Sequence, residues 1–104
     1  MDGYRVFTWD PERFPDPLRL LSELRAQGFR VITTVDPGVK IDAGYRVHDD
    51  GLARDAFCRL PGDALFRGPV WSGDCFFPDF TDARVRTWWG DLHASLLGVG
   101  MAGV

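Results

Sequence analysis

The sequence predicts an α/β fold built on a parallel sheet, and two successive pairs of elements carry the prediction. Residues 16–28 form an amphipathic helical pattern that ends at a glycine, and the β-branched segment 29–35 (FRVITTV) follows directly as a buried strand. A second amphipathic stretch, 82–98, precedes residues 101–104, whose composition is that of the opening of another buried strand. Helices that alternate with buried strands are typical of parallel sheets.

Both helices carry start and stop signals. Asp16 suits an N-cap and Pro17 the first helical position, while Gly28 is a natural C-terminal stop. Asp82 is the N-cap candidate of the second helix. The apolar side chains that follow it recur at helical spacing: Val85, Trp88, Trp89, Leu92 and Leu96.

Two other segments show no helical or strand periodicity. Residues 1–15 are rich in aromatic side chains and proline and are expected to form an ordered loop. Residues 37–80 are longer than the roughly 12–15 residues beyond which structureless connections become uncommon, and such connections are usually functional or disordered. Aromatic side chains argue against disorder in this segment, which therefore needs a surface to pack on. They are Tyr45, Phe57, Phe66, Trp71, Phe76, Phe77 and Phe80.

Composition excludes several classes of protein. The 26% charged and 13% aromatic residues are unlike a disordered or collagen-like chain. Twelve basic and 15 acidic side chains give a net charge of −3 without a basic cluster, which argues against a nucleic-acid partner. No apolar run is long enough to cross a membrane, and no signal segment is recognisable. Two cysteines favour a reducing compartment, so we expect a cytoplasmic protein.

The predicted elements do not close a sheet. Two helices, one complete strand and one strand opening leave a wide apolar sheet face and two unpaired edges. We therefore expect residues 1–104 to be one segment of a larger barrel or sheet protein, without an internal domain boundary. The alternative is a small but complete α/β domain.

A set of short motifs resembles glycoside hydrolase family 31, the family of α-glucosidases and α-xylosidases. The motifs lie in the order and with the spacing of the family, and they cover nearly the whole chain. They are MDGYRVFTWD at 1–10, RFPDP at 13–17, VDPGV at 35–39, GYR at 44–46, GPVWSG at 68–73, FPDFT at 77–81 and the tryptophan pair at 88–89.

The resemblance implies a partial TIM (β/α)8 barrel. The pieces would be the loop after the second strand, the second helix, the third strand with its long loop, the third helix and the start of the fourth strand. Active sites of such barrels lie at the C-terminal ends of the strands, which accounts for a long aromatic loop after a strand.

The resemblance also implies retaining hydrolysis by two carboxylates, neither of which is in this chain. The family's nucleophile belongs to a Trp-x-Asp-Met-Asn-Glu motif that would follow Val104, and the acid/base carboxylate comes later. The aspartates that hold the glucose ring belong to an Asp-x-Asp-Tyr-Met motif that would end at Met1. We therefore expect no catalytic residue and no hydrolytic activity in residues 1–104 alone.

Three residues match the family's substrate pocket. Trp71 matches a tryptophan that holds the non-reducing sugar, for which an indole face is suited; the alternative is a core tryptophan. Thr34 stands where the family often has isoleucine, which leaves the exact sugar preference open. Asp36 either orients pocket carboxylates or caps a turn. Asp79 is interpreted as a turn residue, and Asp74 is given no role.

The sequence gives little support for a metal site or for cysteine chemistry. His48 and His93 lack the spacing of a metal site and are expected to be exposed or packed against loops. Cys58 and Cys75 are interpreted as two buried thiols, and whether they approach each other is left open. Neither a metal nor a cofactor is expected.

Three hypotheses for function follow. The first is a portion of a retaining α-glucosidase that removes terminal α-linked glucose from oligosaccharides; its partners would be the α-glucoside substrate and the remainder of the barrel, and a homo-oligomeric parent is left open. The second is a truncated, non-catalytic product. The third is a small carbohydrate-binding module that uses Trp71 and other loop aromatics.

Overall fold

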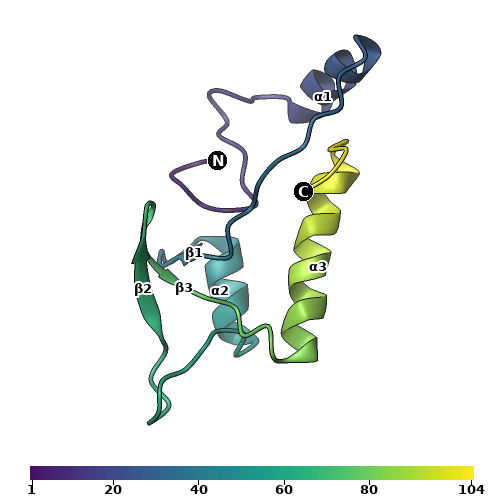
Figure 1. The fold of residues 1–104 in the computed structure, drawn as a ribbon. Helices are drawn as coiled ribbons and strands as arrows, with labels where there is room; N and C mark the ends of the chain where they lie inside the picture. The colour runs from purple at the N-terminus through teal and green to yellow at the C-terminus, as the bar shows by residue number, and fades with distance from the viewer.

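The structure, a computed structural model, describes residues 1–104 as an elongated molecule of 53 × 28 × 21 Å. Three helices and three short strands follow one another in the order α1, β1, α2, β2, β3 and α3 (Figure 1). Helix α1 stands at one end, and the strands, α2 and α3 form the body of the molecule. None of the helices combines the length and the apolar character that crossing a membrane requires.

Helix α1 spans Pro17–Ala26 and begins as the sequence predicts. The Asp16 carboxylate accepts a hydrogen bond of 2.9 Å from the Arg19 backbone N–H, and Pro17 occupies the first turn. Its apolar stripe is largely uncovered, because only Leu21 is buried while Leu18 remains 62% exposed. Figure 1 shows why: the helix stands apart from the other elements.

The prediction of a buried strand at 29–35 is wrong for this structure. The segment is extended but makes only an isolated parallel bridge, between Ile32 and Gly103. Two backbone hydrogen bonds flank it, from Ala102 N–H to the Val31 carbonyl (2.7 Å) and from Thr33 N–H to the Gly103 carbonyl (3.3 Å). Ile32 is 73% exposed. A buried strand needs partners along both edges and cover on both faces, and residues 101–104 provide only a short stretch of one edge.

Residues 37–80 contain regular structure that the sequence analysis did not predict. Strands β1 (Val39–Lys40), β2 (Arg67–Val70) and β3 (Gly73–Phe76) form an antiparallel sheet in the order β1-β3-β2. Helix α2 spans Arg46–Ala53. Strands of two to four residues are too short to show an alternating pattern, and α2 has no side-chain N-cap and contains a glycine.

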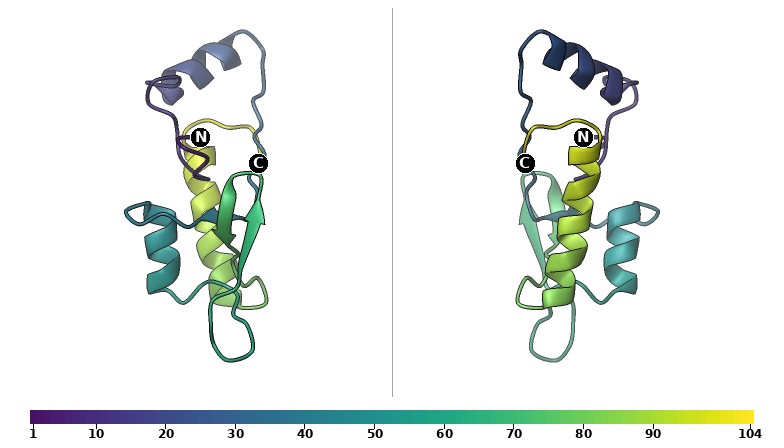
Figure 2. Two further views of the ribbon diagram at one scale, coloured as in Figure 1. Left: turned by 90° about the vertical axis from the view of Figure 1, so that its left-hand side faces the viewer. Right: turned by 90° about the vertical axis from the view of Figure 1, so that its right-hand side faces the viewer.

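Helix α3 spans Ala83–Gly98 and confirms the second predicted helix. The Asp82 carboxylate accepts a hydrogen bond of 2.7 Å from the Arg84 backbone N–H. Its buried side chains are Val85, Trp88, Leu92 and Leu96. The hairpin of β2 and β3 and helix α3 lie on opposite sides of the body in Figure 1, and Figure 2 shows α2 standing to one side of both.

The core joins the N-terminal loop to β1, α2 and α3. Its buried members are Val6, Val39, Tyr45, Val47, Ala56, Phe57, Val85, Trp88 and Leu92. Polar atoms in or beside this cluster are paired. The Tyr45 hydroxyl donates to the Val6 carbonyl at 2.6 Å, and the Trp88 indole N–H donates to Asp50 Oδ2 at 2.7 Å. The first bond joins the loop 1–9 to the residue before α2, and the second joins α2 to α3, which contributes three of the nine core residues.

Candidate functional site

Trp71 stands at the tip of the β2–β3 hairpin. Val70 pairs with Gly73, so Trp71 and Ser72 form a two-residue turn between the strands. Gly73 closes the turn at φ 107°, a backbone conformation that glycine adopts without a steric penalty. The Trp71 side chain is 64% exposed, so it is not a core tryptophan in this structure.

The structure brings Asp36 to Trp71. The indole N–H donates a hydrogen bond of 2.9 Å to Asp36 Oδ2, although the two residues lie 35 positions apart in the chain. Asp36 ends the extended segment that Val31 begins. Along this segment Val31, Thr33 and Val35 are half-buried, whereas Ile32, Thr34 and Asp36 are exposed, which is the alternation of a strand with one open face.

A cavity of about 290 Å³ lies beside the Trp71–Asp36 pair. The residues that line it come from the N-terminal loop, the end of the extended segment and the hairpin: Tyr4, Val6, Asp36, Pro37, Gly38, Val70, Trp71, Ser72 and Phe77. Aromatic surface, a carboxylate and two hydroxyl groups therefore meet at one opening. Such a combination suits a polar ligand that has an apolar face, of which a sugar ring is an example.

Thr34 does not line this cavity. It borders a second, largely apolar cavity of about 340 Å³ between α1 and the extended segment, together with Phe14, Leu20, Leu24 and Ile32 among others. The structure thus brings together two of the three residues that the sequence indicates for the pocket. Thr34 shares only the exposed face of the segment with Asp36.

The other carboxylates near the hairpin are engaged in structural contacts. Asp74 on β3 forms an ion pair of 2.9 Å with Arg67 on β2. Asp79 accepts hydrogen bonds from the backbone N–H and the hydroxyl of Thr81, at 3.0 and 2.6 Å, in agreement with its interpretation as a turn residue.

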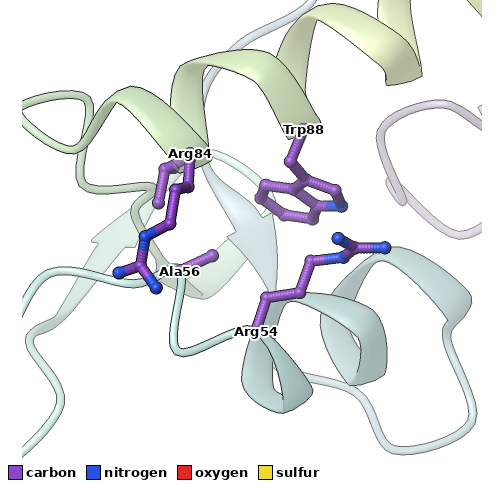
Figure 3. A pocket seen from close by; sticks show the side chains of 5 residues that line it. Arg54, Ala56, Arg84 and Trp88 are labelled. Carbon is purple, nitrogen blue, oxygen red and sulfur yellow. The ribbon is translucent and has the colours of Figure 1, made fainter.

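A further pocket of about 250 Å³ lies between the end of α2 and the start of α3 (Figure 3). Arg54 and Arg84 flank it, and Ala56 and Trp88 contribute to its floor. Both guanidinium groups already have carboxylate partners, since Arg54 pairs with Asp50 at 2.9 Å and Arg84 pairs with Asp82 at 2.5 Å. Both ion pairs are local to one helix, and none of the residues predicted for the sugar pocket lines this cavity.

The histidines are less exposed than expected. His48 is buried on α2, where Nδ1 lies 2.8 Å from Asp49 Oδ1 and the ring stacks on Phe76. His93 is half-buried and meets the rings of Phe7 and Trp89 edge-on. Both rings thus serve the packing around the body of the molecule.

The two cysteines are free thiols. Cys75 is fully buried and its Sγ lies 3.6 Å from Ser72 Oγ, whereas Cys58 is half-buried and its Sγ lies 3.6 Å from the Pro78 carbonyl. The prediction of two buried thiols therefore holds fully for Cys75 alone. Burial, with a smaller contribution from Asp79, raises the pKa of the Cys58 thiol above its ordinary value.

Comparison with known proteins assigns the chain to a family. The model of the glycosyl hydrolases family 31 TIM-barrel domain matches residues 1–104. The chain belongs to glycoside hydrolase family 31. Alpha-glucosidase 2 of Bacillus thermoamyloliquefaciens is 43% identical over 104 residues, which are all of this chain and 13% of that protein. Alpha-glucosidase of Saccharolobus solfataricus is 38% identical, again over the whole chain and over 15% of that protein.

Solved structures show the same relationship. The family 31 alpha-glucosidase from Bacteroides thetaiotaomicron matches with a TM-score of 0.87 at 38% identity, over 97% of this chain and 17% of that one. A glucosidase II alpha subunit, described as alpha3-Glc2-bound, matches with a TM-score of 0.80 at 30% identity, over 86% of this chain and 10% of that one. The family 31 chain therefore spans less than a fifth of each of these relatives, and its fold derives from a TIM barrel.

The extended segment 29–36 shares one feature with the strands of a TIM barrel, the alternation of its side chains. In a TIM barrel each strand is paired along both edges, and its side chains point alternately into the barrel and toward the helices. The exposed members Ile32, Thr34 and Asp36 have the spacing of one such face. Tyr4 lies within the first family motif, but its motif alone indicates no role for it.

Proposed function

We propose that the family 31 chain provides one wall of the sugar pocket in a retaining α-glucosidase that removes terminal α-linked glucose from oligosaccharides. The observation that carries the proposal is the hydrogen bond between Trp71 on the hairpin tip and Asp36 at the end of the extended segment. The bond joins an exposed indole to the end of the extended segment, and it supports the proposal because TIM barrels have their active sites at the C-terminal ends of their strands.

The order of the elements supports a defined place in the barrel. Residues 29–36 would be the third strand, 37–80 its loop, α3 the third helix and 101–104 the start of the fourth strand. The parallel bridge of Ile32 with Gly103 supports this assignment, because strands joined by one crossover helix lie parallel and adjacent. Helix α1 would then be the second helix.

The three pocket residues would have different roles. Trp71 would stack its indole on the apolar C–H face of the terminal glucose, and Asp36 would hold the indole N–H. Thr34, two residues before Asp36 on the exposed face, would border the same sugar from inside the barrel. The nucleophile and the acid/base carboxylate would come from the rest of the barrel, so residues 1–104 would position the substrate and leave bond cleavage to other segments.

The relatives support the choice of substrate. Two proteins that match the whole chain are named α-glucosidases, and one glucosidase II alpha subunit is described with Glc1Man2 bound. The free thiols Cys58 and Cys75 support the reducing, cytoplasmic location that we include in the proposal. Cell fractionation with an antibody against the chain tests that location.

A segment exchange tests the pocket role. Residues 1–104 replace the aligned segment of the Bacillus thermoamyloliquefaciens enzyme, and hydrolysis of maltose is measured. We expect an active chimera in which Trp71→Ala lowers kcat/KM at least about tenfold, because truncation of a tryptophan that anchors a ligand typically costs about 2 kcal/mol or more and about 1.4 kcal/mol already corresponds to tenfold. The kcat/KM of the Trp71→Phe chimera should lie between that of the unsubstituted chimera and that of Trp71→Ala. Leu60→Ala, a truncation elsewhere in the same loop, should leave kcat/KM unchanged; equal effects of the Trp71 and Leu60 variants would contradict the pocket role.

The isolated chain separates catalysis from binding. We expect no turnover of an aryl α-glucoside by residues 1–104, since neither catalytic carboxylate lies within them. A turnover that survives Trp71→Ala but requires an aspartate of this chain would overturn the assignment of roles. The exposure of Trp71 also favours a simpler alternative, a carbohydrate-binding module, which predicts saturable maltose binding by the isolated chain.

A further inference from the structure

Tyr4 lies beside Trp71 and Asp36, two of the residues proposed to form a wall of the sugar pocket. Its side chain is 58% exposed and lines the same cavity as Trp71 and Asp36. The centroids of the Tyr4 and Trp71 rings lie 5.3 Å apart at an interplanar angle of 87°. Aromatic pairs favour this edge-to-face arrangement over a parallel sandwich.

The backbone at Tyr4 is in a conformation that bulky residues rarely adopt. Its φ is 62°, and that of Phe7, three residues later, is 60°. Positive φ at a non-glycine aromatic residue is strained, and such residues persist where the surrounding structure enforces them, often beside a ligand site. Solvent exposure of the Tyr4 ring gives no reason for the strained backbone. We therefore seek the reason in the contact between this ring and Trp71.

Three polar contacts hold the loop around Tyr4. Arg5 Nη2 and Nε donate to Asp42 Oδ2 at 2.6 and 2.9 Å, and Lys40 Nζ donates to the Gly3 carbonyl at 2.8 Å. On the other side, the buried Tyr45 hydroxyl donates to the Val6 carbonyl. The backbone is therefore fixed immediately before and after Tyr4, and the ring is directed at the hairpin tip.

We infer that Tyr4 is a positioning residue that, together with Asp36, fixes the indole plane of Trp71 before a sugar binds. At a hairpin tip, Trp71 lacks a core around it to select a rotamer. The bond to Asp36 anchors one edge of the indole, and the perpendicular Tyr4 ring limits rotation about that anchor. Fixing a binding group in advance lowers the ordering cost of association. The value of this arrangement for a sugar rests on the proposed function.

Indole resonances of the 104-residue chain test the inference without any sugar. The ¹⁵N-labelled chain should give four indole N–H signals, and Trp71→Phe identifies that of Trp71. We expect Tyr4→Leu to move the Trp71 signal and to lower its ¹⁵N–¹H NOE, which reports the mobility of the indole, more than those of Trp9, Trp88 and Trp89. Tyr4→Phe, which keeps the ring, should restore both.

Phe14→Leu is the matched control. It removes the edge-to-face partner of another tryptophan, Trp9, whose ring centroid lies 5.7 Å from that of Phe14. This variant should move the Trp9 signal and leave that of Trp71 in place. An unmoved Trp71 signal in Tyr4→Leu would overturn the inference. A joint collapse of all four signals would also overturn the inference, because Tyr4 would then be a general folding residue. A Trp71 signal at the free-indole position in the unmodified chain would overturn it as well.

Maltose hydrolysis by the segment-exchange chimera connects the inference to the proposed function. We expect Tyr4→Leu to lower kcat/KM for maltose by about two- to tenfold, as the loss of one aromatic pair would, and Tyr4→Phe to leave it unchanged. A chimera in which Trp71→Ala has no effect would contradict the proposed function and leave the positioning role intact. A normal kcat/KM in Tyr4→Leu would show that positioning does not contribute to substrate binding.

Discussion

Gly51 shows how closely single residues are constrained in the body of the molecule. It lies in the middle of α2 and is buried, and a Cβ added there would overlap the Phe57 ring. Phe57 is itself 3% exposed and packs against Trp88 and Phe76, so its ring has little room to move away. The absence of a side chain at Gly51 is therefore what allows α2 to approach the core.

Gly51→Ala should destabilise the chain by about 1–3 kcal/mol, the typical cost of overpacking a core. Gly90→Ala is the matched control, because Gly90 is also inside a helix but an added Cβ would meet no atom within 4 Å. Alanine there should stabilise by about 0.5–1 kcal/mol through helix propensity. Urea unfolding followed by circular dichroism measures both, and a destabilising Gly90→Ala would contradict this account of the two positions.

The Trp71 site shows what residue patterns can and cannot predict. Trp71 and Asp36 were indicated by their motifs, and the structure joins them by a hydrogen bond. Tyr4 was not indicated, because the contact depends on the path of a loop that has no periodicity. Thr34 was placed with the other two, yet it borders a different cavity while the face of its segment stays open. Contacts across separate loops are set by tertiary structure, which a linear pattern does not encode.

Elements with strong local signals were predictable, and elements that depend on partners were not. Helices α1 and α3 have acidic N-caps and apolar side chains at helical spacing, so their bounds follow from the chain itself. Segment 29–35 has the composition of a buried strand, but its hydrogen bonds need neighbours, of which only residues 101–104 are present. Helix α2 is held by tertiary contacts of Val47 and His48 rather than by caps.

The cap of α3 should make stability depend on pH. Hydrogen bonds from the Arg84 side chain and then its backbone N–H hold the pKa of Asp82 below its ordinary value. Because the folded pKa is lower than the unfolded one, ionised Asp82 stabilises the fold at pH values above about 3.9. This contribution is lost as the pH falls through the folded pKa.

Unfolding of the chain and of Asp82→Ala, compared from pH 6 downward, measures the effect. The variant should be less stable at pH 6, and the difference should shrink as the pH falls through the folded pKa of Asp82, because the carboxyl group then becomes protonated in the folded state as well. Asp82→Asn keeps a side-chain oxygen that can cap the helix, but it has no titrating group there. The difference in stability between Asp82→Asn and Asp82→Ala should therefore not shrink with falling pH because of this residue. A difference between Asp82→Ala and the unmodified chain that stays constant with pH would contradict an ionised cap.

On the scale of the whole molecule, the chain buries little of its apolar surface. Its radius of gyration is 15.2 Å, against about 13 Å for a typical compact domain of this length. Only 16 of the 104 residues are buried, and the exposed large apolar side chains include Leu18, Phe29 and Ile32. Leu20 and Ile32 also border the apolar cavity beside α1. Under the proposed place in a TIM barrel, neighbouring strands and helices would cover this surface.

One substitution should therefore act in opposite directions in two settings. In the isolated chain, the exposed Ile32 should promote self-association, and Ile32→Asp should weaken it by about tenfold or more, since burying such a side chain contributes about 1.5–3 kcal/mol. In the segment-exchange chimera, Ile32 would face the barrel interior, where an unpaired carboxylate is costly, so Ile32→Asp should abolish soluble, active enzyme. Leu60→Asp, also at an exposed aliphatic residue but away from the apolar cavity, should have little effect in either setting. Sedimentation equilibrium of the chain and maltose hydrolysis by the chimera supply the two measurements.

Two outcomes would contradict this prediction. A chain that is monomeric with Ile32 intact and melts cooperatively would show that its apolar surface needs no partner. A chimera that tolerates Ile32→Asp would place this residue outside the barrel interior.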